Sequence, residues 1–249
     1  MSNVDEWDGK VPGAFNLRDL GGNPVAGGTI APGRVFRCDL LHRVDAELGA
    51  RWLHQNDVRT LIDLRTLGER EGDGFMAASE HLDSLHRGLL DEVWSWEAEN
   101  AAEDDWFLRD RTLEMYERFP DRIAQVLGDI AAAPANVLFH CTAGKDRTGV
   151  IASALLGVLG ATPEVIAADY ALSTQAMAGI VGWYRSLAGD IPHDPEREQQ
   201  IVDRAATVAT MAGVVEEIER RHGSFAGWAR DAGIGDDLIE ALRAKLVVS

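Results

Sequence analysis

The sequence has few cysteines, a deficit of basic residues and no long apolar segment. Only Cys38 and Cys141 occur among its 249 residues, so no disulfide framework supports the fold and a reducing compartment is expected. The apolar run from Val150 to Leu159 is too short to cross a bilayer. Residues 1–10 are polar and acidic, unlike a signal peptide. These absences predict a cytoplasmic protein without stable membrane insertion, with export by a non-classical route left open.

Basic residues are the minority among the charges, since 24 Lys and Arg face 41 Asp and Glu, which gives a formal net charge of -17. A protein this acidic repels nucleic acids and anionic membrane surfaces unless a local basic patch overrides the mean field. We therefore expect no nucleic-acid partner. The remaining composition is that of an ordinary globular protein, and the length allows a substantial core.

Periodicity and turn residues predict an α/β protein in which a central sheet is flanked by helices and the C-terminal half is largely helical. Short strands at 29–30 and 34–37, among glycine-rich turns, predict a small β meander near the N-terminus. A further strand is expected over 58–64, followed by a Gly-rich charged loop from Gly68 to Gly74. No repeat or linker divides the chain, so residues 1–249 are expected to form one domain.

Capping residues mark where several helices begin and end. Asp45 is expected to cap one helix, Pro120 and Thr162-Pro163 to start two others, and Gly223 to end a fourth. The stretch 94–119 is acidic and rich in aromatic side chains. We expect it to be helical, and to form either a lid over a site or an ordinary packed helix.

The segment from His140 to Thr148 reads His-Cys-Thr-Ala-Gly-Lys-Asp-Arg-Thr, between a buried strand pattern at 137–139 and a buried helix pattern at 150–159. A strand-to-helix turn directs backbone N–H groups and the positive end of the helix dipole to one point, where an anion binds. A thiol at the start of such a turn is expected to ionise readily. The guanidinium of Arg147 offers two parallel N–H bonds to phosphate oxygens. Together, Cys141 and Arg147 predict a phosphoryl-transfer site.

Each residue of this segment has an expected role. Cys141 would attack phosphorus and form a phosphocysteine intermediate, because the polar residues that follow it would not be chosen to pack a core around a structural cysteine. Arg147 would hold the equatorial oxygens and the charge that develops on them. Thr148 is expected to donate its hydroxyl to the sulfur, or to act as a simple cap. His140 either orients the loop or is a core histidine, and Cys38 is expected to be core.

The string His-Cys-x5-Arg-Thr resembles the signature of the protein tyrosine phosphatase superfamily. Its fuller form, HCTAGKDRTG from His140 to Gly149, is similar to the bacterial branch of broad or lipid specificity, the protein tyrosine phosphatase B type. That branch also carries Asn-Leu-Arg-Asp-Leu-Gly-Gly, Asp-Leu-Arg and Gly-Ser-Phe, which this sequence has in the same order at 16–22, 63–65 and 223–225. The resemblance therefore covers most of the chain.

The resemblance implies hydrolysis of phosphate monoesters without a metal or another cofactor. The implied substrates are phosphotyrosine, often phosphoserine or phosphothreonine in proteins and peptides, and sometimes phosphoinositides. The implied phosphate-binding residues are those of the loop: Thr142, Ala143, Gly144, Lys145, Asp146 and Arg147. Lys145 adds a cation to the loop, which would favour highly charged ligands such as phosphoinositides through Coulomb attraction.

The acid that protonates the leaving oxygen is open between two carboxylates. Asp146 lies in the loop itself, and the resemblance places Asp63, at a strand end, near the loop. Either could instead form an ion pair with a neighbouring basic side chain, and Asp73 and Asp91 are further candidates on loops. Three other functions stay open beside a broad phosphatase: a phosphoinositide phosphatase, a non-catalytic phosphate-binding module and a sulfurtransferase. The Cys-x5-Arg-Thr continuation counts against the last.

Overall fold

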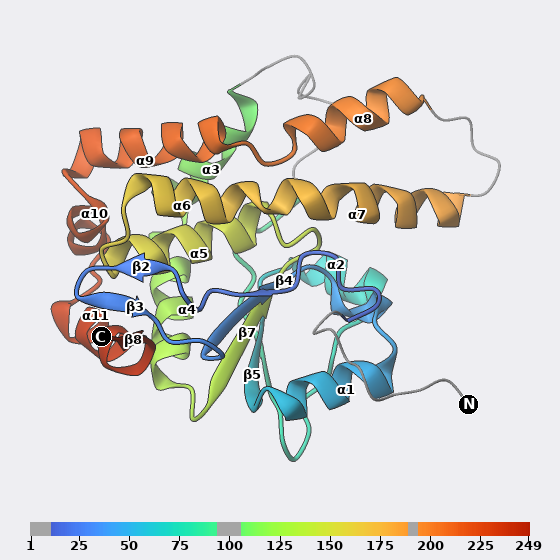
Figure 1. The fold of residues 1–249 in the computed structure, drawn as a ribbon, viewed down its shortest axis with the longest axis horizontal. Helices are drawn as coiled ribbons and strands as arrows, with labels where there is room; N and C mark the ends of the chain where they lie inside the picture. Colours follow the sequence, from blue (N-terminus) through green and yellow to red (C-terminus); the bar gives the residue numbers. More distant parts are fainter. Residues whose placement is uncertain (1–10, 94–105, 189–193) are drawn as a thin grey trace.

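The computed structural model describes residues 11–93, 106–188 and 194–249. A five-stranded sheet has the order β1-β4-β7-β5-β6, and Figure 1 labels its three central strands, β4, β7 and β5. Its strands are β1 (Arg18–Asp19), β4 (Val35–Cys38), β7 (Asn136–His140), β5 (Val58–Asp63) and β6 (Asp83–His86). Neighbours among β4, β7, β5 and β6 pair in parallel, whereas the edge strand β1 is antiparallel to β4. The predicted α/β class with a central sheet flanked by helices is confirmed.

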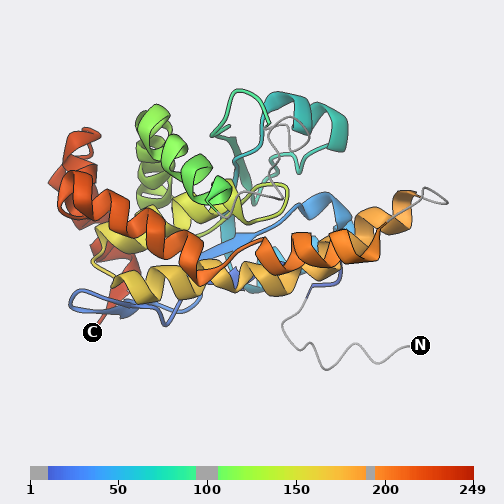
Figure 2. The same ribbon diagram turned by 90° about the horizontal axis from the view of Figure 1, so that it is seen from above.

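Helices cover both faces of this sheet. Helix α1 (Ala46–Gln55) packs on β5, and α5 (Asp146–Val158) packs on β4 and β7, with α4 (Pro120–Ala132) beside it. Helix α8 (Pro195–Arg204) runs alongside α7 (Ser173–Ala188), as Figures 1 and 2 both show. The other helices are η1 (a 3-10 turn, Leu41–Arg43), α2 (Leu67–Asp73), α3 (Phe107–Arg118), α6 (Pro163–Ala171), α9 (Val208–His222), α10 (Phe225–Asp231) and α11 (Asp236–Leu246).

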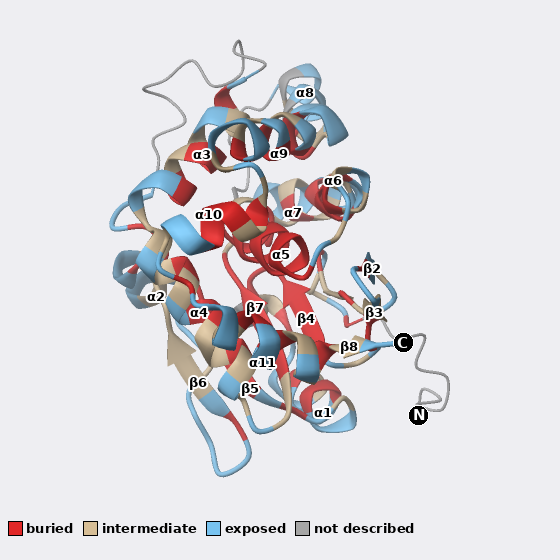
Figure 3. Cartoon of the chain, turned by 90° about the vertical axis from the view of Figure 1, so that its left-hand side faces the viewer, coloured by how far each residue is buried: buried red, intermediate tan, exposed pale blue. Residues whose placement is uncertain are grey.

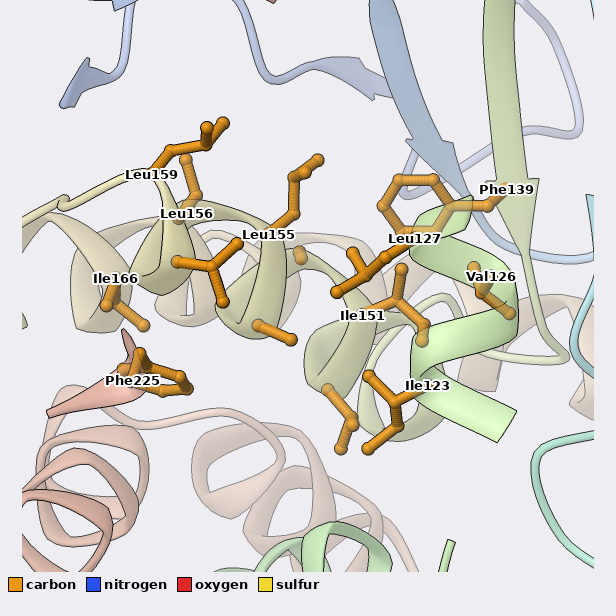
Figure 4. Close-up of a cluster of buried hydrophobic side chains, with 14 of the residues drawn as sticks. Ile123, Val126, Leu127, Phe139, Ile151, Leu155, Leu156, Leu159, Ile166 and Phe225 are labelled. Atoms are coloured by element: carbon orange, nitrogen blue, oxygen red, sulfur yellow. The ribbon is translucent and has the colours of Figure 1, made fainter. Parts of the chain in front are cut away.

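Helix α5 lies at the centre of the largest hydrophobic cluster. Every residue from Arg147 to Val158 is buried, as a helix that is apolar on all sides requires (Figure 3). Its Ile151, Leu155 and Leu156 meet side chains from the sheet, α4 and the C-terminal helices, including Phe139 and Phe225 (Figure 4). This packing fixes the N-terminus of α5 against the end of β7.

The predicted N-terminal meander needs correction. The N-terminal strands do not form one meander, because β4 is buried along its length and joins the central sheet. The strands β2 (Pro24–Val25) and β3 (Gly28–Ile30) instead form a second sheet with β8 (Val247–Val248). The C-terminal half is largely helical as predicted, but it closes with this short strand.

The predicted Gly-rich loop from Gly68 to Gly74 is also wrong, because α2 occupies most of it. Thr66 and Glu69 form a capping box: the Thr66 side chain accepts a hydrogen bond from Glu69 N, and the Glu69 carboxylate accepts one from Thr66 N. This cap outweighs the low helix propensity of Gly68 and Gly72. The helix ends at Gly74, whose φ is 80°.

The predicted helix starts and ends elsewhere are confirmed, but Thr162, at the N-cap of α6, makes no side-chain capping hydrogen bond. The Asp45 carboxylate accepts hydrogen bonds from two backbone N–H groups at the start of α1. Pro120 and Pro163 begin α4 and α6. Gly223 ends α9 in the left-handed conformation, with φ of 77°.

The segment 94–119 is described only in part, since residues 94–105 lie outside the described residues. Its remainder is mostly α3, whose Met115 and Tyr116 are buried in the main cluster. The Tyr116 hydroxyl donates to the carbonyl of Val150 at 3.0 Å, so α3 packs directly on α5. Among the helices of the described segments, none combines the length and apolarity needed to cross a membrane.

Candidate active site

The residues from Cys141 to Lys145, here called the cysteine loop, join the carboxyl end of the central strand β7 to the start of α5. The predicted strand-to-helix turn is therefore confirmed. Ligands of parallel α/β sheets bind at this edge of the sheet. The Cys141 side chain lies at the base of the loop, with its residue only 2% exposed.

Donors from other segments of the chain fix the cysteine loop by hydrogen bonding to its backbone carbonyl groups. Three of them accept hydrogen bonds: Thr142 O from Leu40 N at 3.1 Å, Ala143 O from Asn16 Nδ2 at 2.9 Å, and Gly144 O from Arg37 Nη2 at 2.8 Å. Within the described segments, the backbone N–H groups of the same three residues have no protein partner. A run of such N–H donors forms an anion-binding cradle. The loop is thus arranged to bind an anion beside Cys141.

Gly144 is required by this geometry. Its φ is +64°, and a Cβ at this position would lie 2.6 Å from the carbonyl oxygen of Cys38. A side chain would therefore push the loop away from β4.

A buried ion-pair network connects the cysteine loop to the Asn-Leu-Arg segment near the N-terminus. Asp169 of α6 pairs with Arg37, and with Arg18 at 3.0 Å. Burial alone would raise the pKa of the Asp169 carboxyl, but the two arginines lower it below its ordinary value. Burial and the neighbouring Arg37 lower the pKa of Arg18 to about 10, against the attraction of Asp169. The network ties the Asn-Leu-Arg segment to the carbonyl side of the loop.

Arg147 is held by a residue that the sequence analysis did not identify, Glu69 of α2. Arg147 Nη1 lies 2.5 Å from Glu69 Oε2, and Nη2 lies 2.8 Å from Oε1. Burial opposes charge on both groups, but Cys141 and Glu69 together raise the pKa of Arg147 above its ordinary value. Burial alone would raise the pKa of the Glu69 carboxyl. The hydrogen bonds from Arg147 and Thr142 and the charge of Arg147 outweigh this effect and lower the pKa to about 2.

Asp63, one of the two acid candidates, is enclosed by basic side chains. Its carboxylate accepts hydrogen bonds from Arg65 Nε at 3.0 Å and Nη2 at 2.8 Å, and Arg70 Nε lies 3.1 Å away. Burial acts to raise its pKa, but these hydrogen bonds and the nearby charges of His140 and Arg65 lower it to about 2. Asp63 is ionised at neutral pH in this arrangement.

Asp146, the other candidate, lies in the first turn of α5. Its Oδ1 is 3.3 Å from Lys145 Nζ, and this buried oxygen accepts no hydrogen bond within the described segments. The loop cation therefore pairs with the carboxylate next to it. Asp73 and Asp91 lie farther out, with side chains 40% and 66% exposed.

The structure also shows the surroundings of Thr148, His140 and Cys38. The Thr148 hydroxyl is buried but makes no hydrogen bond within the described part of the chain, so the predicted bond to the Cys141 sulfur is not formed here. The His140 Nδ1 lies 3.2 Å from Cys141 O, and burial lowers the pKa of its imidazole. Cys38 is core, as predicted, and packs with Leu138 in a different cluster from Cys141.

Within the described segments, no three His, Cys, Asp or Glu side chains are grouped to hold a metal ion.

The supporting residues that the sequence analysis missed are Asn16, Arg37, Glu69 and Asp169. Only Glu69 carried a local signal, because Thr66-x-x-Glu69 is a capping-box pattern that fixes where its side chain points. The others act across long sequence separations, such as 127 residues from Asn16 to Ala143.

Comparisons with known proteins identify the family of the chain. Residues 9–248 match the model of a family described as "Tyrosine phosphatase family". The "Triple specificity protein phosphatase PtpB" of Mycobacterium tuberculosis is 27% identical, over 96% of this chain and 98% of the relative. A "Tyrosine-protein phosphatase" of Nostoc commune is 26% identical, over 90% of this chain and 78% of the relative.

Proposed function

The chain belongs to the tyrosine phosphatase family, and from this premise we propose that it hydrolyses phosphate monoesters through a phosphocysteine intermediate on Cys141. The observation that carries the proposal is the cysteine loop, which combines the Cys141 thiol, three backbone N–H groups without a protein partner in the described segments, and Arg147, which lies close enough to Cys141 to interact with it electrostatically. The same arrangement supports phosphate binding by residues 142–147. No metal or other cofactor enters the proposed reaction.

In the proposed reaction, the Cys141 thiolate attacks phosphorus and the bond from phosphorus to the ester oxygen breaks. The leaving oxygen takes a proton from Asp146, while Arg147 and the loop N–H groups stabilise the charge on the equatorial oxygens. Water then attacks the phosphocysteine and gives its proton to the Asp146 carboxylate. Inorganic phosphate leaves and the thiolate is restored, so each turnover consumes one water.

We assign the acid role to Asp146 rather than Asp63. A carboxyl with a pKa of about 2, bound by Arg65 and Arg70, has no proton to donate near neutral pH. Asp146 lies beside Arg147 in the loop-helix junction and accepts no hydrogen bond at Oδ1 within the described segments. Asp63 then serves as a structural anchor for Arg65.

We propose broad substrate specificity, with phosphotyrosine and also phosphoserine or phosphothreonine. The similarity to a phosphatase named for triple specificity, over nearly the full length of both chains, favours breadth. Phosphoinositides are the second candidate substrate class, because Lys145 places a cation in the loop. The two free, buried cysteines fit the reducing cytoplasm, which we propose as the location.

The test is phosphate release by the purified protein in the presence of a metal chelator. The substrates are phosphotyrosine, phosphoserine and phosphothreonine peptides, soluble inositol phosphates and p-nitrophenyl phosphate. Cys141→Ser should abolish release from all of them, whereas retained turnover would contradict the nucleophile. If the wild-type protein binds phosphate esters without turnover, the binding-module function replaces the enzyme.

Asp146→Asn tests the acid in the same assay. The loss should be about 100-fold or more on phosphoserine peptides, whose alkoxide leaving group needs a proton. It should be much smaller on p-nitrophenyl phosphate, whose leaving group departs as an anion. Asp63→Asn is the matched control, and a leaving-group dependence in that variant instead would reverse the assignment.

A further inference from the structure

Three buried polar groups with complementary hydrogen-bonding capacity lie near the start of α5. Within the described segments, the hydroxyl of Tyr170 in α6, Asp146 Oδ1 and Arg37 Nε are all buried and make no hydrogen bond. Buried polar groups in folded proteins are nearly always paired. A guanidinium nitrogen only donates and a carboxylate oxygen only accepts, whereas a hydroxyl does both. We propose that the Tyr170 hydroxyl donates a hydrogen bond to Asp146 Oδ1 and so positions the acid of the proposed reaction, on which this inference rests.

The Tyr170 ring lies beside the first turn of α5. A Cβ at Gly149 would lie 3.0 Å from both Cδ2 and Cε2 of Tyr170, and 3.9 Å from Arg37 Nη2. Gly149 follows Asp146 by three positions, so the two residues share a face of the helix. The charges of Asp146 and Arg37 both act on the pKa of the Tyr170 hydroxyl. The three groups therefore come together at the end of the cysteine loop.

Asp146 is the charged acceptor that remains for the hydroxyl proton. Arg37 has no acceptor atom, so the hydroxyl cannot donate to it. Asp169 precedes Tyr170 in α6, but its Oδ1 accepts from Arg18 and its Oδ2 from Arg37. The carboxyl of Asp146 has no such partner at Oδ1 within the described segments.

The hydrogen bond requires movement of the acid rather than of the tyrosine. Tyr170 is 1% exposed and belongs to the main hydrophobic cluster, so its ring is fixed. The Asp146 side chain is 18% exposed and can turn until Oδ1 meets the hydroxyl. Oδ2 is then left to carry the proton that the leaving oxygen takes. As this proton departs, the bond to Oδ1 becomes charge-assisted and stabilises the carboxylate that forms.

Tyr170 acts through Asp146 and not as an acid itself. Burial and the charge of Asp146 raise the pKa of the Tyr170 hydroxyl well above its ordinary value, against the opposing effect of Arg37. The hydroxyl therefore keeps its proton throughout the reaction. Lys145 Nζ lies 3.3 Å from Asp146 Oδ1 and adds charge, but an ammonium group on a flexible stem does not fix the rotation of a carboxyl.

A tyrosine that serves only to fill the core makes the opposite prediction for stability. Its unpaired hydroxyl would be a burden on the folded state, so Tyr170→Phe would remove this burden and stabilise the protein. A hydroxyl that donates to Asp146 instead contributes stability, which the same substitution removes. The two interpretations differ in sign.

The first test is kcat/KM of Tyr170→Phe on a phosphoserine peptide and on p-nitrophenyl phosphate. The variant should lose about tenfold or more on the peptide, whose leaving group needs the Asp146 proton, and less than about threefold on p-nitrophenyl phosphate. In an Asp146→Ala background, the further loss on the peptide should be below about threefold, because no acid remains to be positioned. Equal losses on both substrates, no loss, or the full loss without Asp146 would overturn the inference.

Tyr116→Phe is the matched control for this test. Tyr116 is also a buried tyrosine that packs on α5, but its hydroxyl contacts Val150 O and Ser153 Oγ, which follow Asp146 by one turn or more. Its removal should leave the ratio of kcat/KM between the two substrates unchanged. A shift of this ratio as large as that in Tyr170→Phe would overturn the inference, because the effect would then be one of general packing on α5.

Urea unfolding at neutral pH gives a readout that does not need turnover. Tyr170→Phe should lower the urea midpoint in the wild-type background but not in the Asp146→Ala background, where the hydroxyl has lost its acceptor. A midpoint that stays level or rises in the wild-type background, or falls equally in both, would overturn the inference. Inactivity of the wild-type protein would count against the proposed function alone, since the comparison of midpoints still decides whether the bond exists.

Discussion

Three carboxylates around the cysteine loop differ in what their oxygens contact. Asp63 is enclosed by Arg65 and Arg70, Glu69 holds Arg147, and Asp146 pairs with Lys145. Removing one partner of a buried ion pair leaves the other charge unpaired, which costs more than the pair itself contributes. The site therefore depends on residues that do not touch the substrate in the proposed reaction.

Asp63→Asn should lower the free energy of unfolding at neutral pH by about 3 kcal/mol, because the buried Arg65 and the half-buried Arg70 lose a partner. The loss should also depend on pH. Since the folded pKa of about 2 lies below the unfolded value near 4, the stabilisation by Asp63 is present above pH 4 and is lost as pH falls toward 2. Urea unfolding between pH 5 and pH 3 should thus be flatter in the variant than in the wild type.

The control for this measurement is Asp57→Asn. Asp57 forms an exposed pair with Arg59, in which the side chains are 60% and 58% exposed. Such a pair contributes about 0–1 kcal/mol, and Asn tolerates the positive φ of this position. Equal pH slopes for the wild type and Asp63→Asn would show that the Asp63 carboxyl does not carry the stabilisation.

Residues of the candidate site could be predicted from the sequence where the groups that act together lie within a few positions of each other. Cys141 and Arg147 lie six positions apart, in one turn whose geometry follows from its flanking apolar runs. Glu69 lies 78 residues from Arg147, and no periodicity connects them. The proposed choice of Asp146 over Asp63 likewise rests on the positions of Arg65 and Lys145, which the sequence leaves open.

At the scale of elements, α5 links the site to the C-terminal helices. It begins at the cysteine loop and passes through the main cluster to Gly157, which faces Phe225 of the Gly-Ser-Phe segment. Ser224 caps α10 through Gly227 N, and this places Phe225 against α5. A motif far from the site thus contributes to the position of the helix that carries Arg147.

Gly157→Ala should destabilise the protein, because a Cβ there would lie 2.2 Å from Cγ of Phe225. Overpacking of this kind costs about 1–3 kcal/mol, more than the gain of about 1 kcal/mol from helix propensity. Gly128→Ala in α4 is the control, since its Cβ would meet nothing within 4 Å, and it should stabilise slightly. The measurement is thermal unfolding of both variants, and a Gly157→Ala midpoint at or above the wild-type value would contradict the packing.

Elements were predictable where capping and periodicity agree. The start of α4 at Pro120 and the end of α9 at Gly223 follow from the fixed φ of proline and from the tolerance of glycine for positive φ. Helix α2 was not predicted, because its glycines are typical of a turn. The only signal for a helix was the short capping-box pattern of Thr66 and Glu69. The split of the N-terminal strands between two sheets depends on tertiary pairing with β7 and β8.

At the scale of the whole molecule, the main cluster joins the two ends of the chain. It contains Leu20 and Ile30 near the N-terminus together with Leu242 and Leu246 near the C-terminus. Because a domain is defined by its own continuous core, we propose that residues 1–249 form one domain. The net charge of -17 then acts on the candidate active site of this domain.

That charge predicts a salt dependence of opposite sign for two substrates. Raising the ionic strength from 0.01 to 0.15 M shortens the Debye length from about 30 to about 8 Å. Repulsion of a soluble inositol polyphosphate should weaken, so its kcat/KM should rise several-fold. A phosphotyrosine peptide flanked by lysines should show a fall. A fall for the polyphosphate as well would mean that a basic mouth, Lys145 included, overrides the mean field.

The central claim is that Cys141 carries the phosphoryl group during turnover. The most direct measurement is a rapid denaturing quench of the protein with a 32P-labelled phosphotyrosine peptide, followed by mapping of the labelled residue. The account predicts label on Cys141 within the first turnover, more of it when hydrolysis is slowed, and none in Cys141→Ser. Label on any other residue, or turnover by Cys141→Ser, would contradict the account.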